Sequence, residues 1–167
     1  MHYQLRKAQR EDIPQIAALL VKSWREHYHY FLPSSFLKHM SVEKQIARHE
    51  RYYTEQIEYL IVEGENEDLL AFASHGPMRG EEMTCDWELY TLYVASHAQG
   101  KGIGSALLGE LSRQAKQHAS NLGVWVMEQN PFKSFYEKHA FKAVSQMHME
   151  IGNSSIMNIG YLKELST

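Results

Sequence analysis

The chain reads Leu92-Tyr93-Val94-Ala95-Ser96-His97-Ala98-Gln99-Gly100-Lys101-Gly102-Ile103-Gly104-Ser105-Ala106 where an apolar run gives way to glycines. Three glycines stand at alternate positions, and the absence of a Cβ atom lets the main chain come close to a ligand there. A helix should follow, and its N-terminus presents unpaired N–H groups and the positive end of a dipole. The turn therefore predicts a site for a phosphate-bearing ligand.

Two better known phosphate-binding loops fit this turn poorly. A dinucleotide-binding fingerprint would need glycine where Ser105 stands, and a P-loop needs the pattern G-x-x-x-x-G-K-S/T, which the turn lacks. These mismatches disfavour an enzyme that uses the turn to bind ATP or a dinucleotide.

The hydrophobic pattern on either side of the turn predicts an α/β fold with a mixed sheet and helices on both faces. Apolar residues at three- and four-residue spacing predict a helix over residues 13–28, and Ser41 is a candidate cap for a second helical region. In chain order, the expected strands are a short start at Tyr3 and Leu5, a hairpin of 57–62 and 69–74, a long strand over 83–94, a buried strand over 122–127 and two final strands over 141–151 and 156–162. A helix begins near Ile103, and Pro131 opens a short one.

Length and composition set further limits. The 167 residues fit one domain, 1–167, and 44% hydrophobic residues supply a sizeable core. A net charge of −3 provides no positive field for nucleic acid. The longest aliphatic run, Ile16 to Val21, is too short to span a membrane. With a single cysteine, Cys85, and no secretion signal, we expect a cytoplasmic protein.

Two segments resemble the GNAT superfamily of acyl-CoA-dependent N-acetyltransferases. Gln99, Gly102 and Gly104 match the family signature Q/R-x-x-G-x-G/A after a strand ending in Leu-Tyr-Val. Residues 130–141 resemble the family pattern N-P-x-x-x-F-Y-E-x-x-G-F, with Ala140 in place of its glycine. From that alanine we expect a turn without a positive φ angle.

The resemblance implies the GNAT fold, a central mixed sheet of six to seven strands flanked by about four helices. It also implies acetyl-CoA as the donor and direct transfer to a primary amine of a small molecule, peptide or protein. The end of the strand at Leu92 to Val94 would pair with the pantetheine arm, and amides of the glycine turn would hold the pyrophosphate. The cofactor residues so implied are Leu92, Tyr93, Val94, Gln99, Gly100, Lys101, Gly102, Ile103, Gly104, Ser105, Asn130 and Phe135.

The resemblance also implies catalytic residues. Tyr136 matches the family's tyrosine, and an unperturbed pKa of about 10 suits proton transfer to a thiolate whose thiol has a pKa of about 8.5. Glu88 is expected as general base, on the same strand face as Val94 by period-two geometry. The alternatives are that Tyr136 packs as an ordinary aromatic, that Glu88 is a solvated carboxylate and that Asn130 caps the helix after Pro131.

Trp24, Tyr28 and Tyr90 are candidates for an acceptor pocket, with packing as the alternative for the aromatics. The acidic residues Glu81, Glu82, Asp86 and Glu88 would favour a cationic amine. No metal site is expected, because His27 and His29 point to different sides of a helix.

The partners predicted from the sequence are an amine acceptor of unknown identity and a second copy of the chain, with neither nucleic acid nor membrane. Homodimers are common in the family, and the C-terminal strands would offer an interface. The alternative function is a non-catalytic acyl-CoA sensor or interaction module with the same fold.

Overall fold

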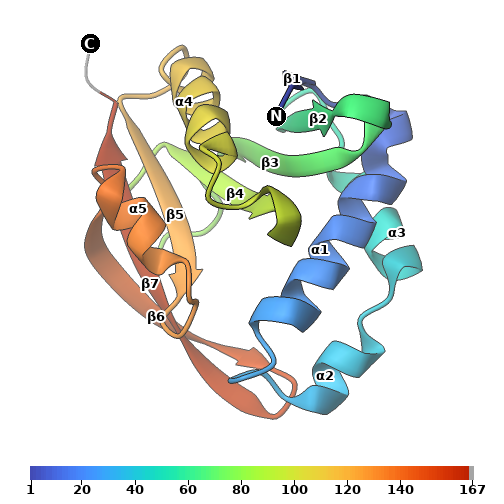
Figure 1. Cartoon of the computed structure of the whole chain (residues 1–167). Coiled ribbons are helices and arrows are strands. Elements are labelled where there is room, and N and C mark those ends of the chain that lie inside the picture. The colour runs from blue at the N-terminus through green and yellow to red at the C-terminus, as the bar shows by residue number, and fades with distance from the viewer. Residues whose placement is uncertain (166–167) are drawn as a thin grey trace.

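One mixed sheet organises the computed structural model, which describes residues 1–165 of the predicted domain. In the described residues the sheet has seven strands in the order β1-β2-β3-β4-β5-β7-β6 (Figure 1). The strands are β1 Tyr3–Lys7, β2 Glu58–Gly64, β3 Leu69–Pro77, β4 Trp87–Val94, β5 Asn121–Met127, β6 Lys142–Ile151 and β7 Ser154–Glu164. Neighbouring strands are antiparallel except for β4 and β5, which are parallel. The predicted mixed sheet, hairpin and parallel crossover are confirmed.

Helices cover both faces of the sheet (Figure 1). The α-helices are α1 Ile13–His27, α2 Ser34–His39, α3 Val42–Tyr52, α4 Ile103–Ala115 and α5 Lys133–Lys138, and short 3-10 turns lie at Arg10–Asp12, Glu65–Glu67 and Ser96–Ala98. The described chain has one α-helix more than the expected four, because the segment after Pro33, which leads to the predicted helical region, forms the short helix α2 and ends at Met40, whose backbone is extended. The predicted cap is confirmed, since Ser41 Oγ accepts a hydrogen bond of 3.1 Å from the Lys44 N–H.

The core lies on both sides of the central strands. Apolar residues of α1, such as Ile16 and Leu20, pack over one face, and those of α4, such as Leu107 and Leu111, pack over the other. Phe72 in the middle of β3 has no exposed surface. Burial on both faces explains why these strands read as continuous apolar runs in the sequence.

The predicted long strand over 83–94 is shorter in the structure, where β4 begins only at Trp87. The preceding loop buries Met83, which is 3% exposed, over β5 and β7. Glycines make room for it, because a Cβ atom on Gly123 would lie 2.7 Å from Met83 Cε, and one on Gly160 would lie 3.2 Å from Met83 Sδ. Burial of this side chain draws the segment away from the strand path.

An extra residue interrupts the pairing of β4 with β3. Ser74 pairs with Thr91, but the next residue of β3, His75, pairs with Leu89, so that Tyr90 has no partner on β3. Successive residues of β3 face opposite sides of the sheet, and therefore Leu89 and Thr91 also face opposite sides although they are two apart. This bulge reverses the alternation of side chains along β4.

The bulge makes one sequence prediction wrong. Glu88 lies opposite Leu89 in the alternation and so shares the α1 and α3 face with Thr91. Val94 faces α4 instead, where its Cγ2 atom would lie 3.5 Å from a Cβ atom on Gly104. Glu88 and Val94 are thus on opposite faces, because period-two geometry does not hold across a bulge.

The prediction for Ala140 is also wrong, because its φ angle is +68°. This residue follows α5, and the N–H of Phe141 donates to the carbonyl of Tyr136 across it at 3.1 Å. Such a closing hydrogen bond requires a left-handed residue at this position whichever side chain it carries.

Ala140→Gly should therefore stabilise the protein by up to about 1 kcal/mol, because glycine removes the strain of a left-handed alanine but adds freedom to the unfolded chain. Urea unfolding measures this change. Ala106→Gly, inside α4, is the matched control and should destabilise by about 1 kcal/mol. Equal losses in both variants would contradict the strain at Ala140.

Candidate active site

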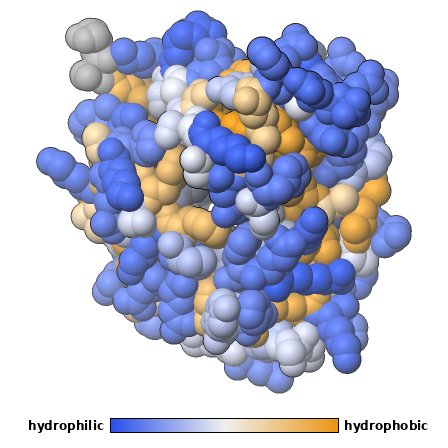
Figure 2. Space-filling model, in the orientation of Figure 1, coloured by the Kyte–Doolittle hydropathy of each residue, from blue (hydrophilic) through white to orange (hydrophobic). Residues whose placement is uncertain are grey.

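Strands β4 and β5 separate soon after they meet. They pair only where Glu88 lies beside Gly123 and Leu89 beside Val124. Beyond these pairs, the β4 edge that faces β5 is left without a ladder partner among the described residues. Two cavities of about 370 and 530 Å³ open along the separated strands. On the face shown in Figure 2, hydrophobic residues reach the surface around a hollow near its middle.

The smaller cavity lies at the glycine turn. Most of the predicted cofactor residues line it, namely Leu92, Tyr93, Val94, Gln99, Gly100, Gly102, Gly104, Ser105, Asn130 and Phe135. Two others do not. Lys101 Nζ donates a hydrogen bond of 2.9 Å to the His97 carbonyl, and the Ile103 side chain is 1% exposed in the core. Only the main chain of Ile103 is left to contribute to the turn.

The glycines leave the turn open to a ligand. Gly100 and Gly102 have φ angles of +72° and +80°, and no atom lies within 4 Å of a Cβ atom placed on either. At Gly104, an added Cβ would lie 3.4 Å from the Phe135 ring. Gln99 Nε2 holds the turn to the end of β4 by a hydrogen bond of 3.1 Å to the Val94 carbonyl. This cradle at the N-terminus of α4 suits a phosphate group.

The larger cavity lies on the α1 and α3 face of the sheet. All three residues predicted for the acceptor pocket line it, Trp24, Tyr28 and Tyr90. The β6–β7 turn approaches α2 at one end, where a Cβ atom on Gly152 would lie 3.6 Å from atoms of Pro33 and Phe36. Apolar residues of α1, α2 and the β6–β7 hairpin pack together there and enclose this end.

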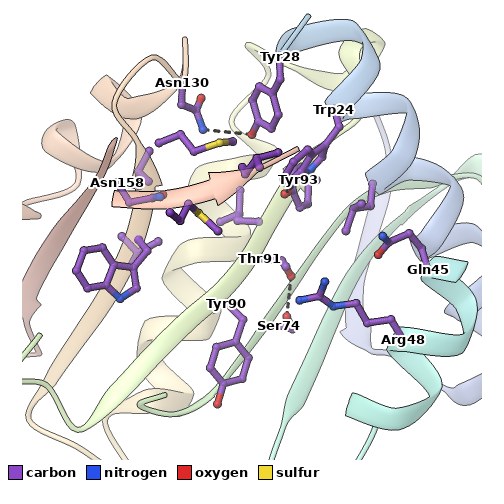
Figure 3. Close-up of a pocket in the computed structure, with 18 of the residues that line it drawn as sticks. Trp24, Tyr28, Gln45, Arg48, Ser74, Tyr90, Thr91, Tyr93, Asn130 and Asn158 are labelled. Carbon is purple, nitrogen blue, oxygen red and sulfur yellow. Dashed lines mark hydrogen bonds between the residues drawn. The ribbon is translucent and has the colours of Figure 1, made fainter. Parts of the chain in front are cut away.

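The two cavities meet at shared side chains. The residues that line both are Tyr28, Leu92, Tyr93, Asn130 and Tyr136. Hydrogen bonds hold this junction, since Trp24 Nε1 donates to the Tyr93 hydroxyl at 2.7 Å and Asn130 Nδ2 donates to the Tyr28 hydroxyl at 3.2 Å (Figure 3). Asn130 Oδ1 also accepts from the Phe132 N–H at 2.8 Å, so this residue both caps the turn before α5 and faces the cavities.

Tyr136 lies at the junction and is 8% exposed. Burial, followed by the nearby Tyr93, raises the pKa of its hydroxyl well above the usual range. The hydroxyl therefore carries its proton throughout the neutral pH range, and its pKa lies further above that of a thiol than the unperturbed value used in the sequence-based prediction.

Glu88 is buried, 2% exposed, and paired with Arg79. Arg79 Nη2 donates to Oε1 at 2.9 Å, while Arg79 Nε and the Arg79 backbone N–H donate to Oε2 at 3.2 and 3.0 Å. The guanidinium also lies 4.0 Å from the centre of the Tyr90 ring. Glu88 therefore lies in the wall of the larger cavity as a buried carboxylate whose charge Arg79 balances, and it is not solvated.

The other acidic residues expected near the acceptor lie elsewhere. Glu81, Glu82 and Asp86 are exposed in the loop before β4 and do not line either cavity. The loop therefore supplies no negative charge to the wall, and the sequence argument for a cationic amine loses its support.

Several polar residues of the larger cavity were not found from the sequence. Gln45 and Arg48 reach it from α3 (Figure 3), and their three-residue spacing on one helix face was the only signal. His49 and Asn158, from α3 and β7, also line it. Their Nε2 and Nδ2 atoms are buried without a hydrogen-bond partner among the described residues. A polar ligand would satisfy them.

Other features assign no further chemistry. In residues 1–165, no three His, Cys, Asp or Glu side chains gather as a metal site would require. His27 lines the smaller cavity, while His29 is exposed. Cys85 is half-buried, and burial raises the pKa of its thiol. No helix in the described part of the chain has the length and apolarity needed to cross a membrane.

Comparisons with known proteins agree with this geometry. Residues 17–156 match the acetyltransferase (GNAT) domain family. The uncharacterized N-acetyltransferase YuaI of Bacillus subtilis (strain 168) is 32% identical over 158 residues, which are 93% of this chain and 90% of that protein.

Two solved structures share the fold. PaiA N-acetyltransferase from Thermoplasma acidophilum, in complex with coenzyme A, has a TM-score of 0.72 at 22% identity and covers 98% of this chain and 99% of its own. The yncA protein from Salmonella typhimurium, with its cofactor acetyl-CoA, has a TM-score of 0.72 at 19% identity over 98% and 94%.

His49 makes the stability of the protein sensitive to acid. Burial, and after it the charge of Arg48, lowers the pKa of His49 to about 4, so between about pH 6.5 and 4 the unfolded chain binds a proton that the folded chain does not. As the pH is lowered through this range, the free energy of unfolding should fall by up to about 3 kcal/mol. His49→Asn should remove that part of the loss in urea unfolding at pH 7.5 and 5, whereas His29→Asn, at an exposed site, should not. An acid response unchanged by His49→Asn would contradict the assignment.

Proposed function

Because the chain belongs to the GNAT family of acetyltransferases, we propose that it transfers the acetyl group of acetyl-CoA directly to a primary amine of a small molecule. One observation carries this proposal. The glycine-turn cavity and the larger cavity share five lining residues, among them Tyr136. A donor in one cavity and an acceptor in the other would thus meet beside a buried hydroxyl. Such a meeting point is what direct transfer within a ternary complex requires.

The residues of the smaller cavity fit a CoA thioester. The open backbone at Gly100 and Gly102 and the N-terminus of α4 suit its pyrophosphate. The unpaired edge of β4 offers main-chain groups to its amide-bearing arm, as a sheet edge does to an added strand. Acetyl-CoA, when bound, supplies the thioester from which an amine takes the acetyl group and CoA leaves as a thiol.

A small molecule is the acceptor class that the larger cavity favours. Its volume of about 530 Å³ lies within the range of small-molecule sites. The hairpin of β6 and β7 packs against α1 and α2 and closes one end. An extended peptide would need that end open, so a compact amine fits better than a protein segment.

Tyr136 is the proposed general acid. Its hydroxyl stays protonated, and it lies where the two cavities meet. It would give this proton to the sulfur that leaves as the nitrogen–carbon bond forms. Burial keeps water from competing for that position.

Glu88 is the proposed acceptor of the amine proton. Its carboxylate lies in the wall of the larger cavity, on the same face of β4 as Thr91. Because Arg79 engages both carboxylate oxygens, the proton would pass through water to the remaining lone pairs. Arg79 also fixes the direction in which the carboxylate points.

Tyr136→Phe should lower kcat for amine-dependent thiol release at least ten-fold, because the leaving sulfur loses its proton donor. Acetyl-CoA should still raise the melting temperature of this variant as much as that of the wild type. Tyr53→Phe removes another tyrosine hydroxyl, one that donates to the Ala8 carbonyl outside both cavities, and should leave kcat unchanged. An unaltered kcat in Tyr136→Phe would remove this residue from the mechanism, and no stabilisation of the wild type by acetyl-CoA would sink the proposed activity.

Glu88→Gln should lower kcat/KM at least ten-fold near neutral pH, and the deficit should shrink as the pH approaches the pKa of the amine. Solvent then deprotonates the amine, and the base is no longer needed. A pH–rate profile of both enzymes measures this, with the exposed Glu81→Gln as control. A deficit that is equal at every pH would instead make Glu88 a positioning residue for Arg79.

A further inference from the structure

The charged side chains that line the larger cavity are only partly paired. Four line it, Arg48, Arg79, Glu88 and Glu150. Arg79 and Glu88 neutralise each other through their ion pair. Arg48 and Glu150 form no ion pair with any described residue, which leaves one free charge of each sign.

These two free charges stand at different ends of the cavity. Arg48 is on α3, which packs over β2 and β3 through His49 and its contacts with Tyr59 and Phe72. Glu150 is on β6, the edge strand at the other end of the sheet. The positive charge therefore belongs to the wall beside β3 and β4.

Arg48 is directed at the cavity although the residue as a whole is exposed. Its guanidinium extends from α3 toward Ser74 and Thr91, and Gln45 lies beside it on the same helix (Figure 3). The Arg48 side chain forms no hydrogen bond with another described residue, and its guanidinium carbon lies 5.6 Å from the centre of the Tyr52 ring.

Other polar groups are available along the same cavity. The Ser74 and Thr91 hydroxyls are hydrogen-bonded to each other at 2.6 Å and form part of its wall. Asn158 is 4% exposed, and its Nδ2 donor has no partner among the described residues. A buried donor without a partner costs free energy, so its retention here points to a ligand that accepts hydrogen bonds.

We propose that the acceptor is a small amine that also carries a carboxylate, and that Arg48 binds this carboxylate. A planar guanidinium binds carboxylates through two parallel hydrogen bonds, and a charge-assisted pair of this kind is strong. A polyamine would bring further positive charge to the wall that already holds Arg48. Among the described residues, Glu150 would be the one unpaired acidic side chain of the cavity available to bind it. This inference rests on the proposed transfer to an amine and specifies its acceptor.

The test compares acceptors that differ only in the carboxylate. Phenylalanine, methionine and 4-aminobutyrate are each assayed for thiol release against their carboxamides, with spermidine as the polycation. At least one acid should exceed its amide ten- to a hundred-fold in kcat/KM, as expected for about 1.5–3 kcal/mol from a charged hydrogen bond. Arg48→Gln should reduce that ratio to below about three-fold, and Arg48→Lys should retain part of it. Arg51→Gln, an exposed residue of the same helix that does not line the cavity, should keep the wild-type ratio.

The outcomes separate this inference from the proposed function. If amides or spermidine are the better substrates, or if Arg48→Gln keeps the preference, the carboxylate site is wrong while amine acetylation stands. If acetyl-CoA stabilises the protein but no amine releases thiol, the proposed transfer fails. The carboxylate site is then judged by melting temperature in the presence of saturating CoA, where the acids should stabilise the wild type and not Arg48→Gln. No stabilisation by any of the acids would overturn it.

Discussion

The extra residue in β4 determines which side chains meet in this protein. Because Tyr90 has no partner on β3, Glu88 and Thr91 face the same cavity, while Val94 turns toward α4. A regular strand would place every second residue on one face, so Glu88 and Thr91, which are three apart, would face opposite sides. The same strand parts from β5 after Leu89. Both sheet irregularities fall where the two cavities lie, as bulges often do beside active sites.

The charges near these cavities are arranged so that few are left free. Burial of Glu88 would be costly without a partner, and three hydrogen bonds from Arg79 offset that cost. The pair therefore adds no net charge to the acceptor wall. Two charges without an ion-pair partner among the described residues remain in that wall, Arg48 on α3 and Glu150 on β6. The proposed acceptor chemistry depends on the first of them, on a helix that carries no family motif. Tyr28, directly after α1, and Tyr136 on α5 are buried at the junction, and burial raises the pKa of both hydroxyls.

Much of the fold followed from local patterns. Apolar residues repeat at helical spacing in 13–28, and they alternate or run continuously in the strands. These patterns follow from which residues are buried, so they predict the elements directly. The glycine turn and residues 130–141 indicated the family, and most of the residues that they implied line the smaller cavity. The length of β4 and the φ angle of Ala140 were not predicted correctly. The length of β4 depends on contacts of Met83 across the fold, which a local pattern does not contain. The φ angle of Ala140 depends on a local hydrogen bond that closes the end of α5, and the glycine of the family pattern at this position was its signal.

The sequence by itself determined most of the helices and strands and the open backbone of the glycine turn, because these depend on residues close together in the chain, and the order of the elements indicated the mixed sheet. Only the tertiary structure decided how the larger cavity is charged. Arg79 and Glu88 come together because a loop returns to β4, and Arg48 reaches the cavity because α3 packs over β2 and β3. Pairing between charges depends on distance in space, and the sequence separation of these elements carries no information about that distance.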